Sequence, residues 1–342
     1  GAGIALTIRI AKIKKPEKIN LKNEKIGKVE DSNYKIGEEI STREAYGKAL
    51  ARLAKADSKV LAVDAEVSNS TYAEEVKKIK PEQFIESFIA EQNMVGMALG
   101  LSKKGFNIFG SSFSAFLTRA FDQIRMASLS SADFTLCGSH SGVSIGEDGA
   151  SQMGLEDIAM FRVLPNASVF YPSDAISTEK ILLETAKTRG IKYLRTTRAK
   201  TPVIYDEKDK FEIGDFKVLK KSDKDKLVVV GSGITLHEGL KAYQILKAKN
   251  LDVAIVDLYC IKPFNAEKFI SFVQSHGKKV VIVEDHHYEG GIGEMLAEEL
   301  KNTDIELRHL AVKGTPHSGK KDELLRKYNI DSQAIIKECL KE

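Results

Sequence analysis

The sequence predicts an α/β protein with two three-layer domains, each a parallel sheet covered by helices on both faces. Short apolar runs of strand length alternate with amphipathic helical segments along most of the chain, which is typical of such sheets. A charged, irregular stretch at 201–225 interrupts the alternation and predicts a domain boundary. The 342 residues are enough for two complete cores.

The first domain is expected to span 41–205. Ser41 and Glu44 match a capping box ahead of an apolar-periodic run, so a helix should begin there. Further helices are expected to begin near Glu91, Phe113 and Thr178. The expected strands are, in order, 60–63, 84–89, 107–109, 134–137, 168–171 and 192–195.

The second domain is expected to span 215–342, and residues 1–40 to form an arm or linker. Gly231-Ser232-Gly233 follows the first strand of this domain but lacks the third glycine of a dinucleotide fingerprint, so a tight structural turn is expected. A helix then runs through Ala248. The expected strands of this domain are 227–230, 253–256, 280–283 and 305–309.

Composition and charge narrow the class of protein. The net charge of +4 is small against 52 basic and 48 acidic residues, so no dedicated nucleic-acid binder is expected. No apolar stretch reaches the length of a membrane span. Three scattered cysteines suit a reducing compartment. We therefore expect a soluble cytoplasmic protein. Adjacent His286 and His287 lack metal-ligand spacing, and no metal site is expected in this chain.

Glu91 stands where a strand ends and a helix begins. In open parallel sheets, ligands collect outside the carboxyl ends of the strands, which makes this acid a candidate catalytic residue. An acid at a helix start is also a common capping feature. Phe113 and Phe116 have the same ambiguity: their spacing fits a helix core face, or an aromatic wall for a flat heterocycle.

Two further segments follow predicted strands. The loop 137–149 contains four glycines together with His140, Glu147 and Asp148, and a long loop of this kind is typical of a binding site rather than a plain connection. Arg195 and Arg198 end another strand. Their guanidinium groups suit an anionic ligand, although surface salt bridges are the alternative.

Taken together, these segments resemble the C-terminal half of transketolase from about Tyr34 to Glu342. The preceding arm resembles the interdomain linker of that family. The resemblance implies a thiamine diphosphate pyrimidine-binding domain followed by a transketolase C-terminal domain. The segments that carry it are 41–47, 88–94, 116–126, 137–149 and 283–294.

The resemblance also implies site residues. Glu91 would contact N1′ of the thiamine diphosphate aminopyrimidine, in a pocket whose aromatic lining, Phe113 and Phe116, disfavours the ionised carboxylate. His140 is the second implied catalytic residue and lies at the phosphate end of the substrate channel. Glu66 stands where an Asp near the cofactor is usual. The residues implied to bind the sugar phosphate are Arg43, Ser70, His140, Asp148, Gln152 and Arg198.

The chain contains no Gly-Asp-Gly followed about 30 residues later by Asn, the motif that holds Mg²⁺ and diphosphate. The expected function is therefore that of one subunit of a split transketolase of the pentose phosphate pathway. A partner subunit would hold the diphosphate and Mg²⁺ or Ca²⁺, the assembly would be a dimer of heterodimers, and this chain alone would be inactive.

Three alternatives stay open at this point. The chain could be a β-type subunit of a 2-oxo acid dehydrogenase or a deoxyxylulose phosphate synthase. It could be a non-catalytic regulatory paralogue, which the intact Glu91 disfavours. It could also be a fragment of a longer transketolase, in which case residues 1–40 are the cut linker.

Overall fold

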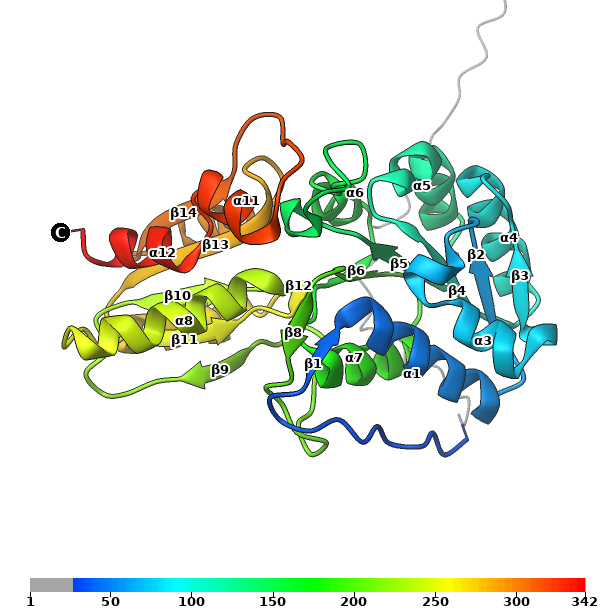
Figure 1. Ribbon diagram of the computed structural model, residues 1–342, viewed down its shortest axis with the longest axis horizontal. Helices are drawn as coiled ribbons and strands as arrows, with labels where there is room; N and C mark the ends of the chain where they lie inside the picture. The colour runs from blue at the N-terminus through cyan, green and yellow to red at the C-terminus, as the bar shows by residue number, and fades with distance from the viewer. Residues whose placement is uncertain (1–26, 342) are drawn as a thin grey trace, which may run out of the picture.

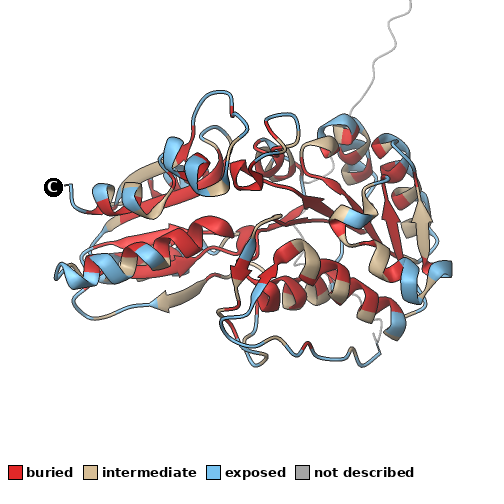
Figure 2. Ribbon diagram, viewed as in Figure 1, coloured by how far each residue is buried: buried red, intermediate tan, exposed pale blue. Residues whose placement is uncertain are grey.

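The computed structural model describes residues 27–341 and contains two large sheets with helices on both faces of each (Figure 1). Most of the expected arm, residues 1–26, lies outside the described residues. The buried residues follow the strands and the inner helix faces (Figure 2). The predicted fold class is confirmed.

The seven-stranded sheet has the order β12-β6-β7-β5-β4-β2-β3, and all its strand pairs are parallel except β12–β6. Helices α1, α3 and α7 cover one face, while α4, α5 and α6 cover the other. The strands are β2 (Val60–Asp64), β3 (Phe84–Glu86), β4 (Asn107–Phe113), β5 (Phe134–Ser139), β6 (Ser168–Phe170), β7 (Ile191–Arg195) and β12 (Cys260–Lys262). The helices are α1 (Thr42–Ala56), α2 (Ser68–Thr71), α3 (Glu74–Ile79), α4 (Glu91–Lys103), α5 (Phe121–Leu129), α6 (Asp157–Arg162) and α7 (Ala175–Lys187), with 3₁₀ turns η1 (Pro81–Gln83), η2 (Phe116–Ala120) and η3 (Val143–Ile145).

The five-stranded sheet has the order β14-β13-β10-β11-β9, with only β9 antiparallel to its neighbour among the described strands. Helices α9 and α10 pack on one face and α8, α11 and α12 on the other. The strands are β9 (Lys217–Lys220), β10 (Val228–Gly231), β11 (Ala254–Asp257), β13 (Lys279–His287) and β14 (Glu306–Val312). The helices are α8 (Ile234–Ala248), α9 (Ala266–Ser275), α10 (Ile292–Leu300), α11 (Lys321–Lys327) and α12 (Ser332–Cys339).

The two sheets are joined by a shared strand and a shared apolar core, in addition to the chain that links them. Strand β12 comes after β11 in sequence but pairs with β6, so the seven-stranded sheet includes a strand from the second half. A small antiparallel ribbon pairs β1 (Glu39–Ser41) with β8 (Lys200–Pro202). One apolar core continues from the seven-stranded to the five-stranded sheet and includes residues of α6, β10 and α9. The halves therefore pack as neighbours with a shared core.

Several expectations for the elements were wrong. Phe113 ends β4 rather than beginning a helix, because β4 lies inside the sheet and Phe113 pairs with Ser139 of β5. The expected strand 84–89 stops at Glu86, and the side chains of Phe88 and Ile89 are exposed. Ser41 makes no side-chain capping bond to α1. Strands β8, β9 and β12 were not predicted, because long-range antiparallel pairing forms them.

The turn at Gly231-Ser232-Gly233 is structural, as expected. Gly233 caps α8 with a positive φ of 56°, and a Cβ there would lie 2.1 Å from the Tyr171 ring.

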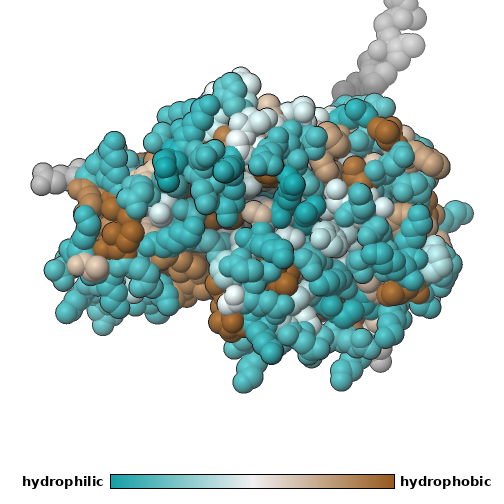
Figure 3. Space-filling model, in the orientation of Figure 1, coloured by the Kyte–Doolittle hydropathy of each residue, from teal (hydrophilic) through white to brown (hydrophobic). Residues whose placement is uncertain are grey.

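None of the helices between residues 27 and 341 is long and apolar enough to cross a membrane. The face of the molecule in Figure 3 is mostly hydrophilic, with separate small hydrophobic patches.

Candidate active site

The predicted site residues gather where the strands of the seven-stranded sheet end. Phe113 is the last residue of β4, and His140 directly follows β5 with a positive φ of 58° that turns the chain out of the sheet. Arg198 follows β7 by three residues, and Glu91 begins α4 after the short β3. Parallel strands place their carboxyl ends at one edge, which is why distant segments meet here.

Glu91 is buried, with 2% of its surface exposed, and it forms an ion pair with an arginine that sequence reasoning did not assign. The Arg119 guanidinium donates from Nη1 to Glu91 Oε2 over 3.0 Å. Arg119 itself is about half exposed, at 54%. Among the described residues, Arg119 is the one hydrogen-bond partner of the Glu91 carboxylate, so the capping alternative is not realised. We had expected purely apolar surroundings for Glu91, and the Arg119 guanidinium shows that this expectation was wrong.

Three rings stack on one another near the ends of β4 and β5. The Phe113 and Phe116 rings lie 5.0 Å apart at an angle of 15°, and the His140 ring stacks on Phe113 at 3.8 Å and 16°. Phe113 is buried, whereas Phe116 is half-buried. The pair therefore forms an aromatic surface that ends at an imidazole, rather than a helix core face.

His140 connects the aromatic surface to a cationic group. Its Nε2 lies 3.5 Å from Arg43 Nη1, and its Nδ1 lies 2.9 Å from Ser139 Oγ. Since arginine can only donate, Nε2 acts as the acceptor and Nδ1 carries the proton. Burial and the nearby charges of Arg43 and Arg198 lower the pKa of His140 to about 3. The imidazole is therefore neutral at physiological pH.

We expect His140 to show no titration between pH 5 and 8, although an ordinary histidine titrates near 6.5. The pKa of His140 is lower in the folded chain than in the unfolded chain, so between these two values the unfolded chain binds one more proton. The contribution of His140 to the free energy of unfolding is therefore fully present above pH 6.5 and declines as the pH falls from 6.5 towards 3. NMR of the His140 ring protons as a function of pH measures this. A His140 midpoint near pH 6.5 would contradict the assignment.

The cationic end contains Arg43 and Arg198. Arg43 donates from Nη1 to the carbonyl of Ser70 over 2.9 Å, and its guanidinium carbon lies 5.4 Å from the centre of the Tyr72 ring. Arg198 donates to Asp148 Oδ2 over 2.8 Å and to the Ile145 carbonyl over 3.3 Å. Ser70 thus contributes its carbonyl, rather than its hydroxyl, to this arrangement.

As far as the structure describes the chain, Arg43 keeps an unused hydrogen-bond donor, and the side chain of Arg198 is 40% exposed. The Nε of Arg43 is buried and has no hydrogen-bond partner in the described part of the chain. Burial is the main cause that lowers the pKa of Arg43, and the charge of Arg198 adds to it, whereas Tyr72, Asp148 and Glu44 act in the opposite direction. Asp64, which was not predicted, accepts hydrogen bonds from the Val67 amide and the Thr71 hydroxyl and so orders the segment that contains Ser70. Its burial raises the pKa of Asp64 to about 7.

Two predicted site residues are not joined to this cluster by any hydrogen bond within residues 27–341. Glu66 is exposed and has a positive φ of 60°, and its amide donates to Glu86 Oε1 over 2.9 Å. Gln152 is half-buried in the loop after Asp148, where its amide donates to the Gly149 carbonyl. Each follows a strand of the seven-stranded sheet and bonds through its backbone N–H.

The sequence suggested that Arg195 and Arg198 could form an anion site together, but Arg195, the last residue of β7, does not take part in one. Its guanidinium is fully buried and forms an ion pair with Asp157, with 2.7 Å between Nε and Oδ2. It also donates to the carbonyls of Gly154 and Asp285. Alternate residues of a strand point to opposite sides, and Arg195 points into the protein.

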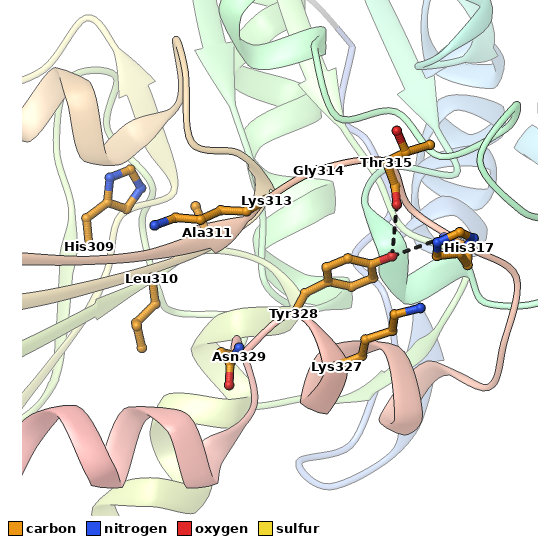
Figure 4. Close-up of a pocket in the computed structure, with 10 residues that line it drawn as sticks. All are labelled: His309, Leu310, Ala311, Lys313, Gly314, Thr315, His317, Lys327, Tyr328 and Asn329. Carbon is orange, nitrogen blue, oxygen red and sulfur yellow. Dashed lines mark hydrogen bonds between the residues drawn. The ribbon is translucent and has the colours of Figure 1, made fainter.

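A separate pocket of about 450 Å³ lies in the five-stranded half (Figure 4). It is lined by the end of β14, the segment 313–317 and residues 327–329. The Tyr328 side chain lies across it, and its hydroxyl donates to the Thr315 carbonyl and accepts from the His317 backbone amide (Figure 4). None of the predicted site residues lines this pocket. Within residues 27–341, no group of three His, Cys, Asp or Glu residues is placed to hold a metal ion.

Comparison with known protein families finds two matching domains, one for each half of the chain. Residues 38–203 match the transketolase pyrimidine-binding domain, and residues 216–335 match the transketolase C-terminal domain. The chain belongs to the transketolase family. The resemblance inferred from the sequence is thus confirmed.

Relatives in the transketolase family show how much of the family's length the chain represents. It is 50% identical over 305 residues to transketolase-like protein 2 of Mus musculus and 47% identical over 305 residues to transketolase of Homo sapiens, covering 89% of this chain and 49% of each relative. The chain therefore spans about half the length of the curated relatives it matches. A solved structure described as "Split gene transketolase, inactive beta4 tetramer" has a TM-score of 0.81 and 34% identity, covering 88% of this chain and 97% of that one.

Proposed function

We propose that this chain is one subunit of a split transketolase and binds the pyrimidine end of thiamine diphosphate together with the sugar phosphate. The complete enzyme transfers a two-carbon ketol unit from a ketose phosphate to an aldose phosphate. A second polypeptide supplies the diphosphate-binding domain and holds Mg²⁺ or Ca²⁺. The assembly is a dimer of heterodimers, since closed symmetric assemblies are the usual form of oligomeric enzymes.

Two observations support a split enzyme. The match to the split-gene transketolase covers 97% of that chain, whereas the match to the human enzyme covers only 49%. The β4 tetramer of the split-gene relative is described as inactive, which suits a subunit that needs another chain.

The observation that carries the functional proposal is the double contact of His140. Its ring stacks on Phe113 at one side and meets Arg43 at the other. An aromatic surface for a heterocycle and a cationic end for a phosphate are therefore continuous through one side chain. A substrate whose reacting carbons lie beside the cofactor would place its phosphate near Arg43 and Arg198.

The residues present fit the pyrimidine end of the cofactor. Phe113 and Phe116 offer stacked aromatic faces, which suit offset stacking with a flat ring. Glu91 is a buried carboxylate that can hold a proton at a ring nitrogen. When bound, thiamine diphosphate supplies the electron sink for cleaving the carbon–carbon bond next to the ketose carbonyl.

Four residues of the site then have defined tasks. Glu91 would exchange a proton with the pyrimidine ring through Oε1, because the ion pair with Arg119 engages Oε2. Arg43 and Arg198 bind the phosphate, and Asp148 accepts a hydrogen bond from a donor hydroxyl. Binding energy from the phosphate aligns the reacting carbons, because remote contacts can be used for orientation at the reaction centre.

A substrate panel tests the reaction type. The complex of both chains is offered a ketose phosphate with an aldose phosphate, a 2-oxo acid with an artificial electron acceptor, and pyruvate with glyceraldehyde 3-phosphate. We expect turnover only of the first pair. Turnover of the second would identify a 2-oxo acid dehydrogenase, and turnover of the third a deoxyxylulose phosphate synthase. Binding to the partner without any turnover would identify a regulatory paralogue.

A further inference from the structure

The loop that carries His140 and Asp148 is fastened by a strand of the five-stranded sheet. Asp285 of β13 is fully buried and accepts two backbone hydrogen bonds from this loop. Oδ1 accepts from the Val143 amide over 2.7 Å, and Oδ2 accepts from the Ser144 amide over 3.2 Å. Both amides lie at the start of η3, where a helical turn leaves its first N–H groups without partners. A side chain from the C-terminal half thus caps this turn.

The other end of the loop is fastened by the same strand. The Asp285 carbonyl accepts from Arg195 Nη2 over 2.9 Å, and Arg195 Nη2 also donates to the Gly154 carbonyl over 2.9 Å. The His287 amide donates to the Leu155 carbonyl over 3.2 Å. Inside the loop, the Gly142 amide closes the two ends by donating to Gly154 over 2.7 Å.

Gly142 shows how close the approach is. Its φ is +78°, and a Cβ at this position would lie 2.1 Å from Asp285 Oδ2. Only glycine allows the carboxylate to reach the amides behind it. The contact therefore depends on one residue from each half of the chain.

The fastened segment contains or touches the residues assigned to the sugar phosphate. His140 and Asp148 lie on either side of η3. Arg198 donates both to Asp148 and to the carbonyl of Ile145, which is the last residue of η3. A shift of η3 would therefore move Asp148 and Arg198 together. Glu91 and Phe116 are on other segments and would keep their supports.

We propose that Asp285 is a positioning residue, through which the C-terminal domain sets the loop 140–155 and with it the selectivity for phosphorylated donors. This inference rests on the proposed function for its substrate, because Arg198 and Asp148 are assigned through it. It gives the C-terminal domain a role in substrate recognition beyond packing.

The test compares Asp285→Asn with Asp257→Asn in the complex of both chains. Asp257 is a matched control: it is a fully buried acid at the end of β11 in the same sheet, and it bonds to Ser173 and Tyr205 of the other half but not to the loop. In each variant, kcat/KM is measured for a ketose phosphate donor and for a short ketol donor without phosphate.

We expect Asp285→Asn to lower the preference for the phosphorylated donor about tenfold or more, mainly through KM, since small misplacements of binding groups are costly. Asp257→Asn should leave that preference within about twofold, as should any variant that only weakens packing. Gly142→Ala disturbs the same contact from the loop side and should reproduce the effect. Equal losses for both donors in Asp285→Asn and Gly142→Ala would overturn the proposal.

Hydrogen exchange of the full chain provides an arm that needs no activity. Peptides covering 140–155 should exchange faster in Asp285→Asn than in the parent chain and stay unchanged in Asp257→Asn. Unchanged exchange in Asp285→Asn would overturn the proposal even if the complex is a transketolase. If the parent complex shows no ketol transfer, the proposed function fails, while faster exchange would still establish the positioning role of Asp285.

Discussion

Replacing Glu91 by glutamine will lower ketol transfer by the complex about 10²- to 10⁴-fold, the range typical of losing a positioned proton donor or acceptor. The amide keeps the shape of the side chain but cannot exchange a proton with the pyrimidine ring. Glutamine is close to isosteric with glutamate, so it fits the buried position at the start of α4 and the fold should persist. Steady-state kinetics with saturating thiamine diphosphate measures the loss.

Glu82→Gln is the control for this experiment. Glu82 lies in η1, just before the same strand β3, and pairs only loosely with Lys80 at 3.6 Å. Its replacement should leave kcat unchanged. If Glu91→Gln retained activity within a few-fold of the parent complex, the proton-exchange role of Glu91 would be wrong.

The second large effect concerns stability. Asp157→Asn should reduce the free energy of unfolding by about 3–5 kcal/mol, because it leaves the Arg195 guanidinium buried without its counter-ion. Both side chains have no exposed surface, and Asp157 also accepts a hydrogen bond from the Tyr193 hydroxyl over 2.6 Å. Guanidinium chloride denaturation of the full chain, followed by circular dichroism, measures the change.

Asp122→Asn provides the surface comparison. Asp122 is 72% exposed on α5 and lies 3.6 Å from Arg125, a pair of the kind that contributes little. Its replacement should change the unfolding free energy by less than about 0.5 kcal/mol. A change of the same small size in Asp157→Asn would show that the buried pair does not stabilise the fold.

Local patterns were sufficient for the elements inside each sheet. Buried parallel strands such as β2 and β10 are continuous apolar runs between helical segments, so their sequences identify them. Strand β12 could not be predicted this way, since its partner β6 lies about 90 residues earlier in the chain. The same reason explains Phe113: pairing of β4 with β5 outweighed a helical spacing that held only locally.

The candidate site shows the same limit. The position of Glu91 between a strand and a helix followed from local order alone. Its pairing with Arg119 did not, because the two residues come from separate segments and their spacing of 28 carries no periodic signal. Arg195 and Arg198 looked equivalent in sequence. Only the packing of α6 against β7 shows that Arg195 is structural and Arg198 faces the site.

The most direct test of the central claim is ketol transfer from xylulose 5-phosphate to ribose 5-phosphate with thiamine diphosphate and Mg²⁺. It is run with this chain alone, with a diphosphate-binding transketolase chain alone, and with both. A site shared between two chains predicts turnover only in the mixture. Turnover by this chain alone, or none by a stable complex that binds the cofactor, would contradict the account.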